Sequence, residues 1–505
     1  MKVKLEHLKK LLGEIDDLQK AAAVLEWDQQ TYMPPGGVEA RAVQLATLQE
    51  LAHHKFVSEE IGQLLDDLRS LTDTDDPDSD DARLIQVTLR EYRKARQIPP
   101  ALVAELAQKS ALAHNNWQQA RAEKDFLIFQ PILEELVELI RRKAEHLGYT
   151  EHIYDPLLDI YEPGMTTAEV TAIFRVLKDA IIPLIQGIAE HHDGLQDAVF
   201  QGNFDVKKQW DFGLDVLRHI QYDFQRGRQD KAVHPFTTSF SPNDVRITTR
   251  LKSDSFVTAF FASVHEGGHG LYEQGIPRAL SRTPLCDGAS MAVHESQSRL
   301  WENVVARSRE FWTYFLPRLQ SFYPEHFSDV TVEQIYRSVN VVHPDYIRVE
   351  ADEVSYNLHI FLRFELETEL VAGNIAVKDL PELWNHKMEQ YLGLTPPDDA
   401  LGVLQDVHWS AALFGYFPTY ALGNVLSLQF YECLRRALPG FNEYVTHGEF
   451  TPIVQWLREN IHIHGAKFTP TELVKRVTGE TINPQPYINY LNTKYGELYN
   501  LPYAG

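Results

Sequence analysis

Two histidines one helical turn apart form the clearest chemical pattern in the sequence. Residues 265–269 read His-Glu-Gly-Gly-His. On a helix, His265 and His269 lie on the same face, so both imidazoles can bind one cation. Glu266 is offset from His265 by about 100°, which suits a carboxylate that lies beside a metal ion and does not bind it. The pattern predicts a metal site with an adjacent general base.

A catalytic zinc site needs a third protein ligand, and Glu295 is the downstream candidate. It lies in a second helical pattern, from Met291 to Glu302, which follows a loop and which Ser290 can cap. Zinc lowers the pKa of water towards about 7, and Glu266 can then accept a proton and deliver it to the leaving amine. We therefore expect hydrolysis of a peptide bond or related amide, with one Zn²⁺ per chain.

The helix that carries the two histidines has its own start signal and apolar face. Ser253 or Asp254 can cap it, and Phe256 begins an apolar stripe. Gly267 and Gly268 each cost a helix interior about 1 kcal/mol relative to Ala. A pair of glycines implies that something approaches the backbone closely, and either a ligand or a packed helix explains it.

Most of the remaining sequence has helical periodicity and predicts a mainly α fold. The exception is residues 232–251, where alternating apolar and polar residues around a Ser241–Asp244 turn predict a small β ribbon directly before the metal helix. The acidic run from Thr72 to Asp81 predicts a solvated loop. The clearest helical segments are residues 3–20, 83–97, 100–120, 127–147, 167–190, 355–372 and 421–437.

The length and composition of the chain limit the functions that it can have. A chain of 505 residues exceeds the size of one hydrophobic core, so two or more lobes are expected. The net charge of -23 argues against binding nucleic acid or an anionic membrane. The two cysteines, Cys286 and Cys433, exclude a disulfide framework, and the charged N-terminus lacks the apolar run of a signal peptide. We expect a cytoplasmic protein.

Motifs spread along nearly the whole chain resemble one enzyme family. In order they are Trp27-Asp28-Gln-Gln-Thr-Tyr-Met33-Pro34, His234-Pro235-Phe236, Asp244-Val-Arg246-Ile-Thr248, the His265–His269 motif, His294-Glu295-Ser-Gln297, Ile347-Arg348-Val-Glu-Ala351-Asp352 and Gly402-Val-Leu-Gln405-Asp406-Val-His408-Trp409. The series resembles the thermostable metallocarboxypeptidases of the carboxypeptidase Taq family. No core motif departs from the family pattern.

The resemblance implies a mainly α, elongated body with a deep central groove and a thermolysin-like metal site at its floor. It implies one peptidase unit over residues 1–505, with two helical lobes flanking the groove. Residues 1–80 would roof the groove, and residues 232–306 would supply the ribbon and metal-binding helices. It further implies a homodimer that holds Zn²⁺ or Co²⁺. The substrates would be peptides with a free C-terminal carboxylate and varied side chains.

Arginine is the residue type that binds a carboxylate through two parallel hydrogen bonds. Arg348 is the candidate for the C-terminal carboxylate, and the resemblance points to the same residue. The alternative is an ordinary helical ion pair with Asp352, four residues on. Arg246 is a second candidate, since it lies on the strand before the metal helix, where a strand can pair with the substrate backbone. The alternative is that Arg246 lies on a solvated face of that strand.

Four further residues are candidates for contacts with the substrate. His234 and Tyr420 could donate hydrogen bonds to the oxyanion of the tetrahedral intermediate. Gln405 and His408 could line a substrate subsite or support the residues that do. The alternatives are a core aromatic run around Tyr420 and a buried polar network around Gln405 and His408.

Two other functions remain open at this stage. The same metal site would serve an oligopeptidase or endopeptidase, because zinc ligands do not distinguish internal from terminal cleavage. A helical scaffold with structural zinc is the second alternative, although structural sites are usually closed by four Cys or His ligands.

Overall fold

The computed structural model describes residues 1–72, 76–191 and 198–501. The fold is mainly helical, as predicted, and within the described residues the strands form one three-stranded sheet. Residues 73–75 of the acidic run lie outside the described residues. The loop predicted over Thr72–Asp81 ends earlier than predicted, because α4 (Asp80–Gln97) begins inside it. In the described part of the chain, no helix is long and apolar enough to cross a membrane.

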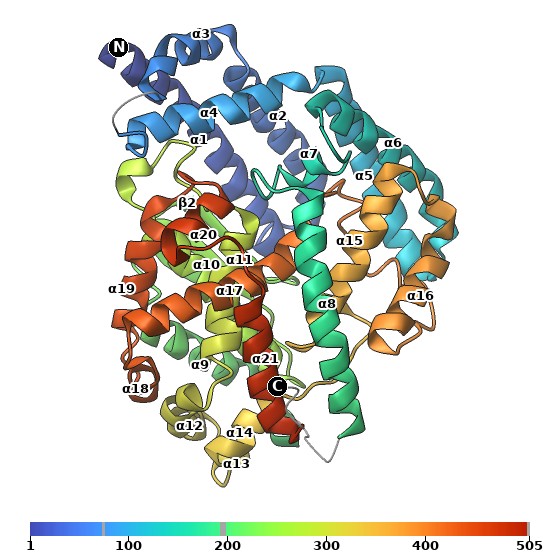
Figure 1. The fold of residues 1–505 in the computed structure, drawn as a ribbon, viewed down its shortest axis with the longest axis vertical. Helices are drawn as coiled ribbons and strands as arrows, with labels where there is room; N and C mark the ends of the chain where they lie inside the picture. The colour runs from blue at the N-terminus through green and yellow to red at the C-terminus, as the bar shows by residue number, and fades with distance from the viewer. Residues whose placement is uncertain (73–75, 192–197, 502–505) are drawn as a thin grey trace. The chain divides into compact units, whose positions relative to one another are not determined.

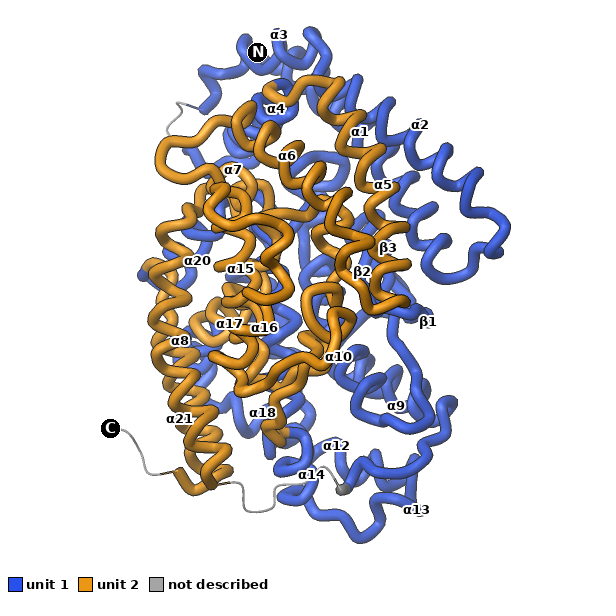
Figure 2. Tube along the Cα trace, turned by 90° about the vertical axis from the view of Figure 1, so that its right-hand side faces the viewer, with its two compact units in different colours: residues 1–96, 196–339, 430–480 blue, residues 97–195, 340–429, 481–505 orange. Residues whose placement is uncertain are grey.

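The chain divides into two compact units, each built from three separate stretches of sequence (Figure 2). The first comprises residues 1–96, 196–339 and 430–480, and the second comprises residues 97–195, 340–429 and 481–505. Helix α17 (Pro418–Ala437) begins in the second unit and ends in the first.

The first unit carries the sheet and most of the helices (Figure 1). Besides α4, its elements are α1 (Lys2–Thr31), η1 (Pro35–Gly37), α2 (Val38–Phe56), α3 (Glu59–Leu68), η2 (Arg69–Thr72), η4 (Ala198–Phe200), α9 (Val206–His219), β1 (Gly227–Lys231), β2 (Thr237–Ser241), β3 (Asp244–Thr249), α10 (Phe256–Gly275), η5 (Arg278–Leu280), α11 (Met291–Arg299), the π-helix η6 (Leu300–Val305), α12 (Arg309–Phe322), α13 (Pro324–Phe327), α14 (Val332–Val339), α18 (Phe441–His447), α19 (Thr451–Asn460), η9 (His462–His464) and α20 (Pro470–Thr478).

The second unit is helical throughout its described residues. Its elements are α5 (Pro100–Glu123), η3 (Phe126–Ile128), α6 (Gln130–Leu147), α7 (Asp155–Leu158), α8 (Thr167–Glu190), η7 (Arg348–Glu350), α15 (Tyr356–Ala372), η8 (Val377–Asp379), α16 (Leu380–Leu392) and α21 (Gln485–Tyr499). In Figures 1 and 2, α21 lies beside α8, with which it packs.

An apolar stripe holds the N-terminal helix α1 in the first unit. Leu5, Leu8 and Leu12 recur every three or four residues and are buried. They belong to one core cluster with Leu65 of α3 and with Leu280, which lies just after the metal helix. The repeat that predicted this helix is therefore the repeat that anchors it.

The sheet has the strand order β1-β3-β2. The predicted ribbon is confirmed, because β2 and β3 pair antiparallel across the Ser241–Asp244 turn. Strand β1 was not predicted, and it pairs parallel with β3. Consequently β3, which carries Arg246, is hydrogen-bonded on both sides. The prediction that this strand pairs with a substrate backbone is therefore wrong.

The metal helix α10 is fixed mainly by aromatic packing. Phe256 and Phe260 stack on each other, and both pack against Phe212 of α9. The cap is Ser255, whose side chain accepts a hydrogen bond from the backbone N–H of Thr258. The predicted caps, two and one residues earlier, are therefore wrong.

Candidate metal centre

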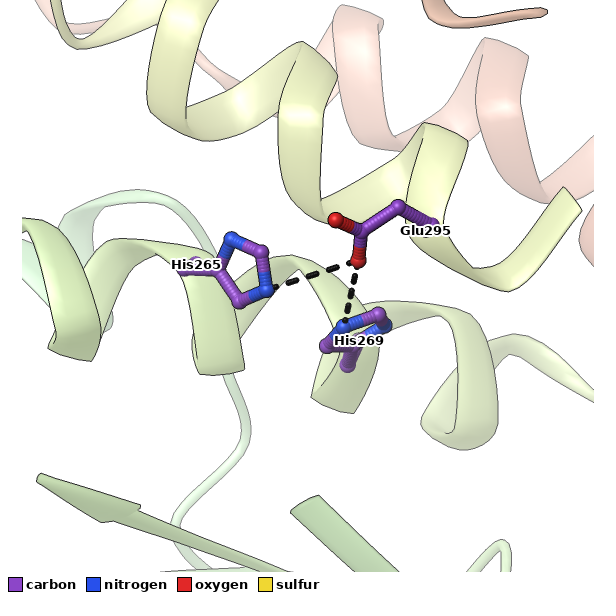
Figure 3. A group of neighbouring side chains, drawn as sticks. All are labelled: His265, His269 and Glu295. Carbon is purple, nitrogen blue, oxygen red and sulfur yellow. Dashed lines mark ion pairs between the residues drawn. The ribbon is translucent and has the colours of Figure 1, made fainter. Parts of the chain in front are cut away.

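His265, His269 and Glu295 converge on one point (Figure 3). Both histidines project from α10 and the glutamate projects from α11. The Glu295 Oε2 atom lies 3.5 Å from Nε2 of His265 and 3.4 Å from Nε2 of His269. The three ligand atoms lie within 4.8 Å of one another. The three residues that the sequence named as metal ligands are brought together.

The close approach of α10 and α11 depends on Gly268. A Cβ atom at this position would lie 2.7 Å from the backbone oxygen of Gln297 and from Cα of Ser298. Gly267 faces α9, where a Cβ atom would meet the Leu217 side chain at 2.5 Å. Close helix packing therefore explains both glycines. The packing of α10 against α11 sets the distance between Glu295 and the two histidines.

The donor set fits a zinc-type ion. Two imidazoles and one carboxylate form the usual set for catalytic zinc. Ligands that lie about 2.0–2.1 Å from zinc at tetrahedral corners are about 3.3–3.4 Å apart, which is close to the separations above. The side chains of His265, His269 and Glu295 are 19%, 15% and 8% exposed, so the site is largely desolvated yet open to solvent.

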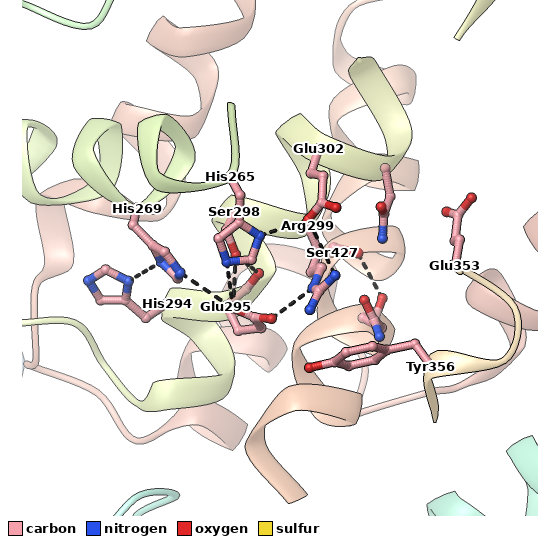
Figure 4. A network of polar contacts seen from close by, with 12 residues as sticks. His265, His269, His294, Glu295, Ser298, Arg299, Glu302, Glu353, Tyr356 and Ser427 are labelled. Carbon is pink, nitrogen blue, oxygen red and sulfur yellow. Dashed lines mark hydrogen bonds and ion pairs between the residues drawn. The ribbon is translucent and has the colours of Figure 1, made fainter. Parts of the chain in front are cut away.

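The Glu302 carboxylate orients the His265 ring from the side that faces away from the centre. The His265 Nδ1 atom lies 2.7 Å from Oε2 of Glu302, which η6 supplies (Figure 4). Arg299 and Arg307 face the same carboxylate at 3.3 and 3.5 Å. Burial alone would raise the pKa of Glu302, but Arg299 and His265 hold it at about 2. Glu302 is therefore an acceptor, and His265 donates Nδ1–H and presents Nε2 to the centre.

The orientation of His269 depends on a second histidine. Its Nδ1 atom lies 2.6 Å from Nδ1 of His294 (Figure 4). The Nε2 atom of His294 lies 2.9 Å from Oε1 of Glu273. The hydroxyl group of Ser298 donates to Glu295 Oε2 at 3.0 Å. Arg299 donates from Nε to the other carboxylate oxygen of Glu295, Oε1, at 2.7 Å. Each proposed ligand therefore has a polar partner at an atom that faces away from the centre.

Glu266 is held by a threonine from the sheet. The Thr237 hydroxyl group lies 2.7 Å from the Glu266 carboxylate and 3.1 Å from its backbone carbonyl oxygen. Glu266 is only 6% exposed, and burial raises the pKa of its carboxyl group. A raised pKa suits a carboxylate that accepts and returns a proton.

The three proposed ligands differ in protonation state when no metal ion is bound. Burial alone would lower the pKa of His265, but Glu295 and Glu302 raise it to about 9. Burial lowers the pKa of His269 to about 4. Burial would raise the pKa of Glu295, but Arg299 and His265 hold it well below its usual range. At neutral pH the metal-free centre therefore holds a proton on His265, which a metal ion replaces.

Two other predicted residues lie on or beside the sheet. Arg246 forms two hydrogen bonds of 2.9 Å with Asp244 and lies over the Trp27 ring, 4.3 Å from its centroid. Its paired N–H groups therefore already bind a carboxylate. His234 is exposed in the loop between β1 and β2.

The second unit contains the other predicted substrate-binding residues in one buried cluster. Arg348 donates to Asp406 from Nε and from a terminal nitrogen at 3.0 and 2.8 Å, and to the Tyr356 hydroxyl at 3.0 Å. Arg363 donates to the other oxygen of Asp406 at 2.6 Å. The predicted alternative, a helical ion pair of Arg348 with Asp352, is wrong, because the partner lies 58 residues away.

The neighbours of Arg348 are polar and mostly buried. Gln405 accepts a hydrogen bond from the Arg348 backbone N–H and donates to the carbonyl oxygen of Tyr346. The His408 Nε2 atom lies 3.1 Å from the Tyr420 hydroxyl, and the Arg348 guanidinium lies 4.7 Å from the Tyr420 ring centroid. Burial lowers the pKa of His408 to about 3, so it is neutral. These contacts favour a supporting role for Gln405 and His408.

Several partners of the ligands were missed, although weak signals exist. Glu302 follows Glu295 by seven residues, two helical turns, so both side chains lie on one face. Glu273 follows His269 by four residues, which is one turn. Thr237 has no comparable signal, because its contact with Glu266 joins a strand to a helix.

Comparisons with known proteins agree with this site. Residues 7–495 match the family described as Carboxypeptidase Taq (M32) metallopeptidase. Carboxypeptidase 1 of Bacillus subtilis is 40% identical over 491 residues, which cover 97% of this chain and 98% of that protein. Thermostable carboxypeptidase 1 of Thermus thermophilus is 41% identical and covers 98% of both chains. The crystal structure of the M32 carboxypeptidase from Deinococcus radiodurans R1 superposes with a TM-score of 0.95 at 40% identity, covering 99% of this chain and 100% of that one.

Proposed function

Because the chain belongs to the carboxypeptidase Taq (M32) family of metallopeptidases, we propose that His265, His269 and Glu295 hold its divalent metal ion. Membership makes the chain a metallocarboxypeptidase, an enzyme that hydrolyses peptides. The single observation that carries the assignment of ligands is the convergence of three donor atoms within 4.8 Å. Zn²⁺ is the ion that two imidazoles and a carboxylate favour, and Co²⁺ suits the same ligands.

A divalent ion held by these three residues would lower the pKa of a bound water molecule and polarise the scissile carbonyl group. The role of Glu266 follows from its place beside the ligand His265. It accepts a proton from the attacking water and returns it to the leaving amine. Thr237 supports this role, since its hydroxyl group holds one carboxylate oxygen at 2.7 Å and leaves the other for the reaction. His234 and Tyr420 are the proposed hydrogen-bond donors to the oxyanion.

Recognition of the C-terminal carboxylate is assigned to Arg348. Arg348, Arg363 and Asp406 together carry two positive charges and one negative charge, and their side chains are at most 10% exposed. Burial alone would raise the pKa of Asp406, but the two arginines hold it far below its usual range. The cluster therefore keeps one positive charge in excess, and a substrate carboxylate would balance it. Arg246 is the weaker candidate, because it forms a one-to-one pair with Asp244 that carries no net charge.

The remaining parts of the proposal rest on the family. They are broad tolerance of C-terminal side chains, a homodimer, a cytoplasmic location, two lobes flanking a central groove, residues 1–80 as its roof and residues 232–306 as the metal-binding segment. Gln405 and His408 are proposed to support Arg348 and Tyr420.

The test compares an unmodified peptide with its C-terminal amide, with products followed by mass spectrometry. We expect stepwise loss of single residues from the free C-terminus and none from the amide. Arg348→Ala should lower kcat/KM for the free peptide by at least about tenfold, whereas Arg246→Ala should have a smaller effect. Equal internal cleavage of both peptides would overturn the assignment of terminal cleavage. A larger loss in Arg246→Ala than in Arg348→Ala would move the carboxylate site to the sheet.

A further inference from the structure

His294 joins a metal ligand to a buried carboxylate. It precedes Glu295 on α11 and contacts His269 of α10 through one ring nitrogen (Figure 4). Its other ring nitrogen contacts a second residue of α10, Glu273. One nitrogen lies 2.6 Å from Nδ1 of His269 and the other lies 2.9 Å from Oε1 of Glu273. The His294 and Glu273 side chains are 18% and 9% exposed. These contacts form one chain that runs from the metal centre to Glu273.

Only one set of ring protons satisfies this chain once His269 binds a metal ion. The ligand nitrogen Nε2 then has no proton, so Nδ1 of His269 carries it and donates. Nδ1 of His294 must accept, and its own proton must therefore lie on Nε2. That proton meets Glu273, which accepts it as a carboxylate. Each hydrogen bond in the chain thus fixes the next one.

We propose that His294 is a positioning residue that fixes the tautomer and ring orientation of His269 and so raises the affinity of the centre for its metal ion. The inference rests on the proposed function, in which His269 is a ligand. His265 has a direct carboxylate partner, Glu302. On its Nδ1 side, His269 contacts an imidazole, that of His294, which in turn contacts the Glu273 carboxylate. The orientation of the His269 ring therefore depends on His294.

Packing restricts the ring of His294 as well. Its ring centroid lies 4.6 Å from that of His269 and 5.1 Å from that of Tyr272. A Cβ atom on Gly288 would lie 2.9 Å from the same ring. The ring therefore has little room to turn. Because His294 contributes both a hydrogen bond and packing, the test needs one substitution that removes the hydrogen bond and another that keeps it.

The experiment measures Zn²⁺ affinity of the full-length protein by competition with a chromophoric chelator. His294→Phe keeps a planar ring but has no acceptor, whereas the amide oxygen of His294→Asn lies near the former Nδ1 position and can accept. We expect His294→Phe to weaken Zn²⁺ binding about 10- to 100-fold and His294→Asn to bind within a few-fold of the unsubstituted protein. His54→Phe, at an exposed position, is the matched control. The visible spectrum of the Co²⁺ form should change in His294→Phe alone.

Each outcome decides between the roles. Unchanged affinity in His294→Phe overturns the proposal, and so does an equal loss in His294→Phe and His294→Asn, which would mark a packing role. If His294→Phe does not fold, Glu273→Gln tests the same chain and should weaken Zn²⁺ binding by several-fold. His269→Ala distinguishes a failure of the inference about His294 from a failure of the ligand assignment. If it abolishes binding while His294→Phe does not alter it, only this inference fails. If it leaves binding unchanged, the ligand assignment fails and the inference fails with it.

Discussion

Substitution of Gly268 by Ala should separate α10 from α11 and weaken the metal centre. The added Cβ atom would lie 2.7 Å from two backbone atoms of α11, whereas ordinary contact begins at 3.4 Å. The helices must therefore move apart by about 0.7 Å. Glu295 lies only two residues before Gln297, one of the two contacted residues, so its carboxylate moves with the helix. Metal–ligand distances tolerate about 0.2 Å, and the displacement exceeds this limit severalfold.

The expected magnitudes follow from opposing effects. Overpacking a buried contact costs about 1–3 kcal/mol, and replacing a helical glycine by Ala returns about 1 kcal/mol. We expect a net destabilisation of about 1 kcal/mol and a loss of Zn²⁺ affinity of at least about tenfold. Urea unfolding of the metal-free protein measures the first quantity, and chelator competition measures the second.

Two glycines serve as matched comparisons. Gly267→Ala should affect Zn²⁺ binding less, since its Cβ atom would meet the end of the flexible Leu217 side chain. Gly187 lies inside α8, and a Cβ atom there would make ordinary contact with Leu501 at 3.7 Å. Gly187→Ala should stabilise the chain by about 0.5–1 kcal/mol and leave Zn²⁺ binding unchanged. Tight Zn²⁺ binding and unchanged stability in Gly268→Ala would refute the reasoning.

Three further results are expected. Glu266→Gln should lower kcat by about 10²- to 10⁴-fold with unchanged zinc content by mass spectrometry, and loss of the metal would contradict a role confined to proton transfer. A strong chelator should abolish peptide hydrolysis, and added Zn²⁺ or Co²⁺ should restore it; activity that persists in the metal-free protein would contradict metal dependence. Burial raises the pKa of Glu367 from 4.5 to about 7, so the folded chain binds this proton more tightly than the unfolded chain does. Its stabilising contribution is complete below pH 4.5 and is lost as the pH rises through about 7, an effect of about 3 kcal/mol. Urea unfolding at pH 5 and pH 8 should show this loss in the unsubstituted protein but not in Glu367→Gln, and equal pH dependence in both would contradict it.

Local sequence patterns were sufficient for several helices and for the histidine pair, although the first helix continues to Thr31, beyond the predicted residues 3–20. The helix predicted around residues 167–190 is α8, because its apolar repeat acts within a few residues. The Thr166–Glu169 capping box, which the prediction did not use, fixes its start. His265 and His269 needed only the helical repeat to face the same way. Glu295 could be named because its helix has a clear start at Ser290 and follows directly in the chain.

Interactions that join distant segments were not visible in the sequence. Strand β1 reads Gly-Arg-Gln-Asp-Lys, which has no strand periodicity, and its partners lie in β3. The alternative considered for Arg348, an ion pair with Asp352, assumed a continuous helix. The structure has only the short 3₁₀ helix η7 there, so the spacing of four places nothing on a common face.

The sequence by itself determined which residue types could bind a metal ion and which of them share a helix face, because helical spacing is a property of the local backbone. Only the tertiary structure decided how those side chains are aimed. The partners Glu302, His294 and Thr237 reach the site from three elements, and the distance between α10 and α11 depends on a missing side chain at Gly268. Such contacts follow from packing between segments, which no local repeat encodes.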